Sequence, residues 1–422
     1  MADIRPFRAL RPAVEYAKDI AALPYDVYSR EEAAIAVQGK PLSFLNIDRP
    51  ETAFPAGCDM YADEVYEHAA AELKSMTEKG YYIREESPCY YVYELTMDGR
   101  SQTGIAALSS VDDYLSGVCK KHENTVAEKE KDRIHHVDTL SAQTGPIFLS
   151  YHASDAIETI IAEAKKQPAL YDFVSEDGIG HRVWVISGAE SVEKLTAAFA
   201  TVPNTYIADG HHRAASAVKV ALKRREADPG YKGDEEFNYF LSVLFPDREL
   251  KIFDYNRVVK DLNGRTVSEF LKELGEIYEI SEVSGEDAEI IRPAEKYTTG
   301  MYLDGHYYML KVKDSIAEAV KSDPVKCLDV SILQDCVLSP ILGIKDPRTD
   351  KRIKFVGGIR GLNEIKKNAD EFSSDGSPAV AFAMYPTFMS ELFGVADAGL
   401  LMPPKSTWFE PKLRSGIFIH EF

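Results

Sequence analysis

The sequence predicts an α+β fold with mixed β-sheets and several β-hairpins. Two pairs of β-prone runs are each joined by an Asp-Gly dipeptide, at Asp98-Gly99 and at Asp304-Gly305. Asp-Gly between such runs is a strong hairpin signal, because both residues tolerate a positive φ. A third pair, within residues 171–187, is joined by a looser turn that contains glycine. Helical segments lie between the runs without a regular βαβ alternation, which favours α+β over a parallel α/β fold.

Three segments have the spacing of amphipathic helices. Residues 58–79 are followed by Gly80, and glycine commonly ends helices. Residues 191–201 and 211–226 each place their apolar side chains on one face, with lysine and arginine outward on the second of them. These three segments are expected to be helices.

The totals limit the class of protein. At 422 residues, with 45% hydrophobic and 10% aromatic content, the chain has material for two or three domains. The Pro- and Gly-bearing segments 228–233 and 322–326 are the best candidate boundaries between them. The net charge of −19 disfavours nucleic acid and anionic membrane surfaces as partners.

The cysteines and the apolar segments indicate a protein of the cytoplasm. The five cysteines are widely spaced and include no C-x-x-C pair, so neither a disulfide framework nor a zinc knuckle is predicted. No signal peptide is recognisable at the start, and no apolar run approaches the length of a membrane span. A cytoplasmic location with reduced cysteines is the expectation.

The segment "TYIADGHHRAASA" is the strongest candidate site. A β-prone run ends at Asp209, Gly210 permits a sharp turn, and His211, His212 and Arg213 open a helix. A helix start offers unpaired N–H groups and a favourable dipole to a phosphate. The arginine fork and the neutral histidines would add donors, and the aspartate could hold Mg²⁺ or orient a hydroxyl. A surface histidine pair and a zinc site are the other interpretations, and the spacing suggests no third zinc ligand.

Two further segments carry reactive groups. In "KKHENTVAEKEKDRIHH", Glu123 follows His122 and precedes Thr125, and a glutamate beside a histidine suits a general base. The same segment also fits a solvated helix, with residues 128–131 as its charged face. In the C-terminal "MPPKSTWFEPKL", residues 405–407 offer one charge and two hydroxyls, or the segment is a tail that packs over a core.

The segment "IADGHHRAASA", which forms the expected strand-to-helix corner, resembles the phosphate-binding signature of the ParB and sulfiredoxin superfamily. It is most similar to the signature of the free serine kinases. This resemblance implies that Gly210, His211, His212 and Arg213 bind nucleotide phosphates. "KKHENTVAEKE" is similar to the segment with the kinases' catalytic glutamate, which assigns that role to Glu123. The segment between it and the corner is longer than in the small kinases.

The resemblance extends to other parts of the chain. "PPKSTW" is similar to a C-terminal kinase segment, which implies that Lys405, Ser406 and Thr407 border the site, with His122 and Thr125 also on the substrate side. Over its whole length the chain resembles a bacterial family catalogued as domain of unknown function number 1015. No cysteine lies near the corner, which argues against sulfiredoxin chemistry, and the negative charge argues against ParB-type DNA binding.

The resemblance implies a phosphotransferase that interconverts free L-serine and O-phosphoserine, with ATP or ADP as donor and Mg²⁺ as cofactor. Glu123 would take the hydroxyl proton, while Asp209 and His211 assist the transfer. A nucleotide-binding regulatory protein and a phosphoserine phosphohydrolase are the alternatives, and a homo-oligomer remains open. The expected division is an α+β region at 1–110, a ParB/sulfiredoxin-like nucleotide-binding core at 111–250, and an α+β region at 251–422 whose tail borders the site.

Overall fold

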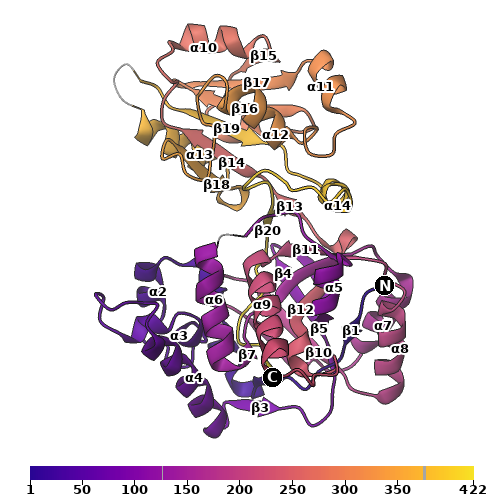
Figure 1. Cartoon of the computed structure of the whole chain (residues 1–422). Coiled ribbons are helices and arrows are strands. Elements are labelled where there is room, and N and C mark those ends of the chain that lie inside the picture. The colour runs from indigo at the N-terminus through magenta and orange to yellow at the C-terminus, as the bar shows by residue number, and fades with distance from the viewer. Residues whose placement is uncertain (126, 374–376) are drawn as a thin grey trace. The chain divides into compact units, whose positions relative to one another are not determined.

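A computed structural model describes residues 1–125, 127–373 and 377–422 (Figure 1). The chain divides into two compact units. The first unit is Met1–Leu250 together with Pro411–Phe422, and the second is Lys251–Glu410. The three-part division at 110 and 250 stays a prediction.

The first unit is built on a mixed sheet that has nine strands among the described residues. β11 is parallel to β6 and β8 is parallel to β12, and the other neighbours are antiparallel. The α+β class with mixed sheets is therefore confirmed. In spatial order the strands are β6 (Cys119–Lys120), β11 (Thr205–Asp209), β8 (Ile147–Tyr151), β12 (Tyr239–Pro246), β5 (Arg100–Ser110), β4 (Tyr90–Met97), β10 (Gly180–Ile186) and β9 (Tyr171–Val174), with β1 (Ile4–Arg5) also beside β5.

All three predicted hairpins are present. Asp98 and Gly99 have φ of 51° and 78° and join β4 to β5, as a two-residue turn with positive φ requires. Asp304 and Gly305 have φ of 51° and 83° and make the same turn in the second unit. The third hairpin pairs β9 with β10.

The three predicted helices are also confirmed, with shifted ends. The first, α4, begins at Asp63 rather than at residue 58, and α8 and α9 match within two residues. Helix α6 packs against α9. The helices of the first unit are α1 (Ala17–Ile20), α2 (Arg30–Ala36), α3 (Leu45–Asp48), α4 (Asp63–Glu78), α5 (Val111–Ser116), α6 (Ala127–Leu140), α7 (Asp155–Ala164), α8 (Ala189–Phe199) and α9 (His211–Ala227), with short 3₁₀ turns that include η2 (Tyr25–Val27) and η3 (Pro50–Ala53).

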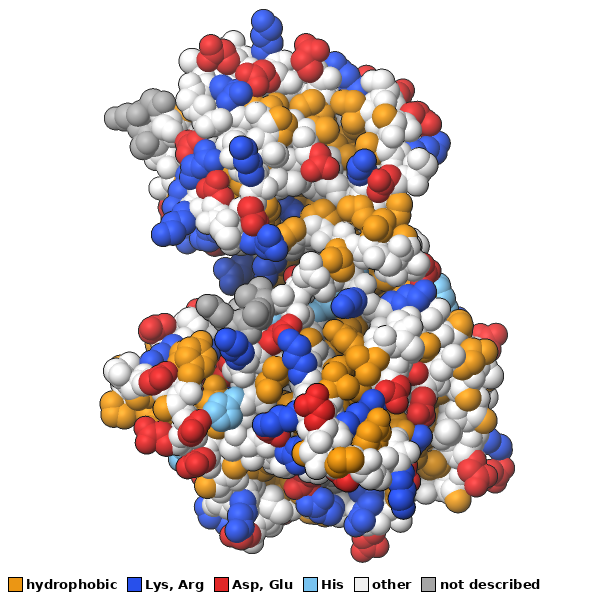
Figure 2. All heavy atoms as spheres, in the orientation of Figure 1, with side chains coloured by type: hydrophobic (Ala, Val, Ile, Leu, Met, Phe, Trp, Pro, Cys, Tyr) orange, Lys and Arg blue, Asp and Glu red, His pale blue; other side chains and the backbone are white. Residues whose placement is uncertain are grey.

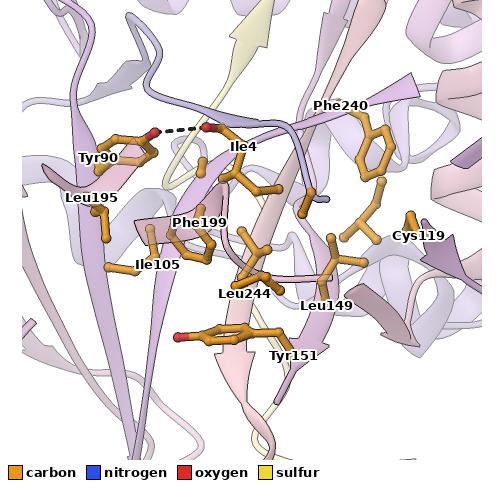
Figure 3. Close-up of a cluster of buried hydrophobic side chains, with 14 of the residues drawn as sticks. Ile4, Tyr90, Ile105, Cys119, Leu149, Tyr151, Leu195, Phe199, Phe240 and Leu244 are labelled. Carbon is orange, nitrogen blue, oxygen red and sulfur yellow. Dashed lines mark hydrogen bonds between the residues drawn. The ribbon is translucent and has the colours of Figure 1, made fainter. Parts of the chain in front are cut away.

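Helices α7, α8 and α9 pack their apolar faces onto this sheet. The resulting core joins strand residues such as Ile105 and Leu149 to helix residues such as Phe199 (Figure 3). The Tyr90 hydroxyl donates to the carbonyl oxygen of Ile4 at 3.0 Å, which ties the N-terminal strand to the same core. The sheet is thereby a rigid support for the loops at its strand ends.

The C-terminal segment returns to the first unit and is deeply buried there. β21 (His420–Glu421) pairs with β7 (Ala142–Gln143), and Ile419 bridges to Leu10 of β2 (Leu10–Pro12), which itself pairs with β3 (Tyr82–Arg84). Ile417, Phe418 and Ile419 are fully buried. This anchoring fixes the residues that precede them, from Pro411 onward, against the first unit.

The second unit is a six-stranded antiparallel sheet in the part of the chain that the structure describes. A separate pair, β13 (Ile252–Phe253) and β20 (Trp408–Phe409), joins the two ends of the unit. The strand order is β15 (Tyr278–Val283), β17 (His306–Val312), β16 (Thr298–Leu303), β19 (Val380–Met384), β14 (Tyr255–Val259) and β18 (Ile353–Gly357), and the helices are α10 (Val267–Leu274), α11 (Asp314–Val320), α12 (Asp329–Leu333), α13 (Leu362–Phe372) and α14 (Met389–Asp397).

The surface charges and the cysteines indicate little about the function. Acidic and basic side chains are interspersed on the face that Figure 2 shows. All five cysteines are free thiols, with Cys89 and Cys119 buried and the other three half-buried. Within the described ranges, no helix is both long and apolar enough to cross a membrane.

Candidate functional site

The candidate site is the corner where β11 passes into α9. Gly210 forms the turn with φ 92° and ψ 30°, a left-handed conformation in which a glycine avoids the strain of a side chain. The N-cap residue is Gly210, which has no side chain that could cap α9. The start of this 17-residue helix therefore presents backbone N–H groups and the positive end of the helix dipole at the corner.

Gly210→Ala is expected to destabilise the first unit by roughly 1–2 kcal/mol, the usual cost of a left-handed conformation for a residue with a side chain. A Cβ at this position would also lie 3.1 Å from the guanidinium carbon of Arg213. Gly188→Ala is the matched control, because Gly188 also precedes a helix but has φ −66°. Urea unfolding should separate the two variants, and equal stabilities would refute the strain at the corner.

The Asp209 carboxylate is held between two cations. Its Oδ2 lies 3.3 Å from Nη2 of Arg213 and 3.5 Å from Nζ of Lys412. Burial works to raise the pKa of Asp209, but the charges of Lys412 and Arg213 outweigh it and hold the pKa well below its usual range. The carboxylate is therefore ionised at neutral pH, with about a third of the side chain exposed (31%).

Arg213 lies beneath the corner. Its side chain is 10% exposed, and Nη1 donates to the carbonyl oxygen of Pro146 while Nη2 contacts Asp209. A Cβ on Gly145 would lie 3.7 Å from its side chain, so this loop also packs closely against it. In this arrangement the guanidinium fixes the Asp209 carboxylate and the loop before β8.

Asp209→Asn is expected to lower the unfolding free energy at pH 7 by roughly 1–3 kcal/mol, because two largely buried cations lose their shared anion. The pKa of Asp209 is depressed, so its contribution is complete above about pH 4 and is lost as the pH falls further. The gap between wild type and variant should therefore narrow in acid. Exposed Asp234→Asn is the control, and a gap independent of pH would contradict the assignment.

The two histidines of the corner have different surroundings. His211 is 6% exposed, whereas His212 is half-buried. The backbone N–H of His122 points at Nε2 of His211 over 3.5 Å, and the two imidazoles meet edge to face at 4.5 Å. Nε2 of His211 is thus the acceptor, which leaves the proton on Nδ1.

Both imidazoles of this contact are neutral at physiological pH. Burial lowers the pKa of His122 to about 4, although the charge of Asp209 opposes it. Burial, followed by the neighbouring His122, holds the pKa of His211 well below its ordinary value. Neither ring nitrogen of His122 has a hydrogen-bond partner among the described residues.

Glu123 is brought to the corner from the loop before α6. Its Oε2 lies 3.9 Å from Nδ1 of His211, and 47% of its side chain is exposed. The structure therefore brings Glu123, His122, Asp209 and His211 together, although the first two lie far from the last two in sequence. A half-exposed carboxylate next to a neutral imidazole is an arrangement that suits proton transfer.

Thr125 is engaged in a separate network. Its Oγ1 donates to the carboxylate of Glu130, which also pairs with Lys219 of α9. Glu130 is 5% exposed, so the expectation of a solvated face at this position is wrong. The apposition of α6 on α9 buries it there, while Lys131 is exposed, and the side chains at 128 and 129 lie outside the described part.

Residues 405–407 belong to the second unit. The carbonyl oxygen of Lys405 accepts from Nη2 of Arg257 at 3.0 Å, and Ser406 Oγ donates to Pro403 at 2.5 Å. Ser406 is buried, as a packed segment would be. That these residues border the site stays a prediction.

The protein family follows from the sequence as a whole. A family model described as "Protein of unknown function (DUF1015)" matches residues 4–331, which is more than half of the chain. The chain belongs to the DUF1015 family. None of the curated proteins compared with it matches.

Several solved structures are similar to this DUF1015 chain at low identity. SbnI with a C-terminal truncation, from Staphylococcus aureus, has a TM-score of 0.36 at 10% identity, covering 72% of this chain and 82% of that one. A variant of a free serine kinase in complex with AMP has 0.34 at 14%, covering 75% and 91%. A conserved hypothetical protein from Pyrococcus furiosus has 0.33 at 16%, covering 75% and 94%. Similarity at this level transfers neither ligand nor activity to this chain.

Sequence reasoning missed Lys412 in this DUF1015 protein. The residue follows Pro411 in "FEPKLR", five residues beyond the last of the tail residues predicted at the site, and the buried C-terminal segment carries it to Asp209. No neighbouring residue indicates this role, because its partner, Asp209, lies far away in the sequence. Across the described residues, no three His, Cys, Asp or Glu side chains converge as a metal site.

Proposed function

We propose that this DUF1015 protein is a phosphotransferase that moves a phosphoryl group between a nucleotide and the hydroxyl of free L-serine. The observation that carries the proposal is the meeting of Glu123 and His211 at the glycine-capped start of α9 beside ionised Asp209. Phosphoryl transfer needs a phosphate cradle, neutralising charge and a base for the hydroxyl. The start of α9 would be the cradle, Asp209 would hold the neutralising cation, and Glu123 would be the base.

The phosphates would bind at the start of α9. The backbone N–H groups of Gly210, His211, His212 and Arg213 supply donors there, and the helix dipole adds a favourable field. The Arg213 side chain is committed to Pro146 and Asp209, so we assign it to holding the corner in place. Its contribution to phosphate binding is then through the backbone.

Glu123 would take the proton of the acceptor hydroxyl. A general base must lie within reach of the proton it takes, and the Glu123 carboxylate is at the corner, 3.9 Å from Nδ1 of His211. Because the pKa of His211 lies well below its ordinary value, this imidazole does not itself compete for the proton at pH 7. The exposed half of Glu123 leaves room for a substrate to approach.

Asp209 is the residue that would hold Mg²⁺. The ion commonly takes one or two protein carboxylates and completes its shell with water and substrate phosphates, so a single ionised aspartate fits it. The shortest contacts of Arg213 and Lys412 are both to Oδ2. Bound there, the ion would neutralise charge on the transferred group.

The identity of the acceptor rests on the resemblance of the corner motif to that of the free serine kinases, and ATP and ADP are both candidate donors. A transfer in which phosphoserine and AMP return serine and ADP is equally compatible with these groups. The same resemblance assigns Lys405, Ser406 and Thr407 to the border of the site.

Phosphorus NMR tests the proposal. The full chain is incubated with Mg²⁺ and serine plus ATP or ADP, or with phosphoserine plus AMP or ADP. Phosphoserine that forms or disappears in step with a change of nucleotide is the expected result. Inorganic phosphate from phosphoserine without nucleotide would identify a phosphohydrolase, and nucleotide binding without any conversion would identify a regulatory protein. Either of these results overturns the phosphotransferase proposal.

A further inference from the structure

A second charged cavity lies in the first unit, apart from the corner. It has a volume of about 230 Å³ and lies between η2, η3, the start of α4 and the middle of α6. Glu123, Asp209, His211 and Lys412 do not line it. It is therefore separate from the candidate site at the corner.

The first unit has two separate cavities with charged side chains in their walls. The larger, of about 450 Å³, is bordered by Lys40 and Arg414, whose charges are already paired with Glu176 and Asp177 at its rim. The smaller, of about 230 Å³, is the tyrosine cavity, so named because Tyr25, Tyr28, Tyr61 and Tyr66 contribute to its wall.

Two ion pairs border the tyrosine cavity. Nε of Arg49 lies 2.6 Å from Oε1 of Glu51, and their side chains are 11% and 4% exposed. Nε of Arg133 lies 2.9 Å from Oδ2 of Asp132, with exposures of 7% and 15%. Both signs of charge are thus present at one small cavity, each largely shielded from bulk water.

Such pairs are poor devices for stability. The desolvation of two buried charges commonly offsets their mutual attraction, and apolar replacements of similar volume are often as stable. Charges that are buried in the wall of a cavity are better explained by a ligand that they recognise. The site therefore favours a ligand that matches both signs.

The pair formed by Arg49 and Glu51 retains unused hydrogen-bonding capacity. Arg49 uses Nε on Glu51 and Nη1 on the carbonyl oxygens of Tyr25 and Tyr28. Within the described part of the chain, Nη2 of Arg49 and Oε2 of Glu51 make no hydrogen bond. One donor and one anionic acceptor are therefore left on neighbouring residues.

Aromatic rings complete the wall. The Arg133 guanidinium lies 4.0 Å from the centre of the Tyr25 ring, and the Tyr66 hydroxyl donates to Oδ1 of Asp132 at 2.8 Å. These contacts hold Arg133 and Asp132 in place and leave them less free to reach a ligand. The apolar faces of the tyrosines suit a small carbon skeleton.

We propose that the tyrosine cavity binds a small zwitterion, a free α-amino acid, with its carboxylate at Arg49 and its ammonium group at Glu51. An arginine fork matches a carboxylate, and an ionised glutamate matches an ammonium group. The inference goes beyond the proposed phosphoryl transfer, because binding here needs neither a nucleotide nor the corner residues.

The cavity also adjoins the support of the corner. Tyr25 and Arg133 also line a smaller cavity of about 30 Å³, and Arg213 lines that one with them. A ligand that restrains Tyr25 and Arg133 therefore acts on side chains that pack near the guanidinium holding Asp209.

Isothermal titration calorimetry on the full chain, without nucleotide, tests this site. The probes are the standard L-amino acids, with L-serine, L-alanine and L-leucine first, and ethanolamine and propanoate as analogues that carry one charge each. At least one amino acid is expected to bind, and each one-charge analogue about tenfold or more weaker. Failure of every standard amino acid to bind at millimolar concentration, or equal binding of ethanolamine, would overturn the proposal.

Glu51→Gln locates the binding. It keeps the shape of the side chain and removes its charge, so the affinity for the amino acid should fall about tenfold or more while that for propanoate stays within about twofold. Exposed Glu67→Gln on α4 is the matched control and should bind as wild type does. If Glu51→Gln does not fold, Arg49→Lys replaces it, because it keeps the charge but loses the planar fork.

These outcomes separate the two proposals. Amino-acid binding that depends on Glu51, in a protein that shows no phosphoryl transfer, would leave the tyrosine cavity standing and refute the transfer. Transfer to serine by a Glu51→Gln variant with unchanged amino-acid affinity would refute the cavity and leave the transfer standing.

Discussion

Glu123→Gln is expected to reduce nucleotide-dependent conversion of serine by about 10²–10⁴-fold, the range that a positioned general base contributes. The amide keeps the size of the side chain but cannot accept the hydroxyl proton. Because Glu123 is not part of the phosphate cradle, the affinity for ADP should stay within about twofold. Initial rates from phosphorus NMR and ADP titration calorimetry provide the two measurements.

Exposed Glu226→Gln on α9 is the matched control for this variant and should keep the wild-type rate. If Glu123→Gln turned over serine as fast as wild type, the base would have to be another residue. A loss of ADP affinity together with the loss of rate would instead indicate that Glu123 shapes the nucleotide site.

A fall in pH from 7 to 5.5 is expected to destabilise the first unit, although this range lies above the pH at which most carboxylates titrate. Burial is the largest cause that lowers the pKa of five histidines in this unit. The unfolded chain binds protons near pH 6.5 while the folded chain does not, so stability falls as the pH drops from there toward 4. Each histidine should contribute about 1 kcal/mol between pH 7 and pH 5.5. The five are His122, His136 and His420, with pKa lowered to about 4, His181, with pKa lowered to about 3, and His211, with pKa well below its ordinary value.

Urea unfolding at pH 7 and pH 5.5 measures this effect. The chain has two tryptophans, Trp184 in the first unit and Trp408 in the second, so a Trp408→Phe background makes fluorescence report on the first unit. Replacement of His420 by glutamine should reduce the pH dependence. Replacement of exposed His306 in the second unit should not change it. Equal unfolding free energies at the two pH values would show that these histidines are not buried neutral groups.

Local sequence signals predicted the local structure well. Asp98-Gly99 and Asp304-Gly305 specify their hairpins through the positive φ that the turn requires, whatever surrounds them. Gly210 between a β-prone run and a helical pattern likewise predicts the corner from adjacent residues.

The features that depend on distant contacts were not predictable. Lys412 reaches Asp209 because the C-terminal segment is buried in the first unit, and Glu130 is buried because α6 packs on α9. The periodicity of a helix shows that one face is polar, but it does not show which second helix covers that face. The position of Arg213 beneath the turn is also set by packing, through Pro146 and the loop before β8.

The central claim is that the start of α9 binds the phosphates of a nucleotide. Selective ¹⁵N-histidine labelling gives backbone amide signals for the ten histidines of the chain, including His211 and His212 in the first turn of α9. Addition of ADP should shift these two signals most, and leave those of half-buried His68 and exposed His306 in place. If the signals of His211 and His212 stay unchanged at saturating ADP, the corner is not the nucleotide site and the account is wrong.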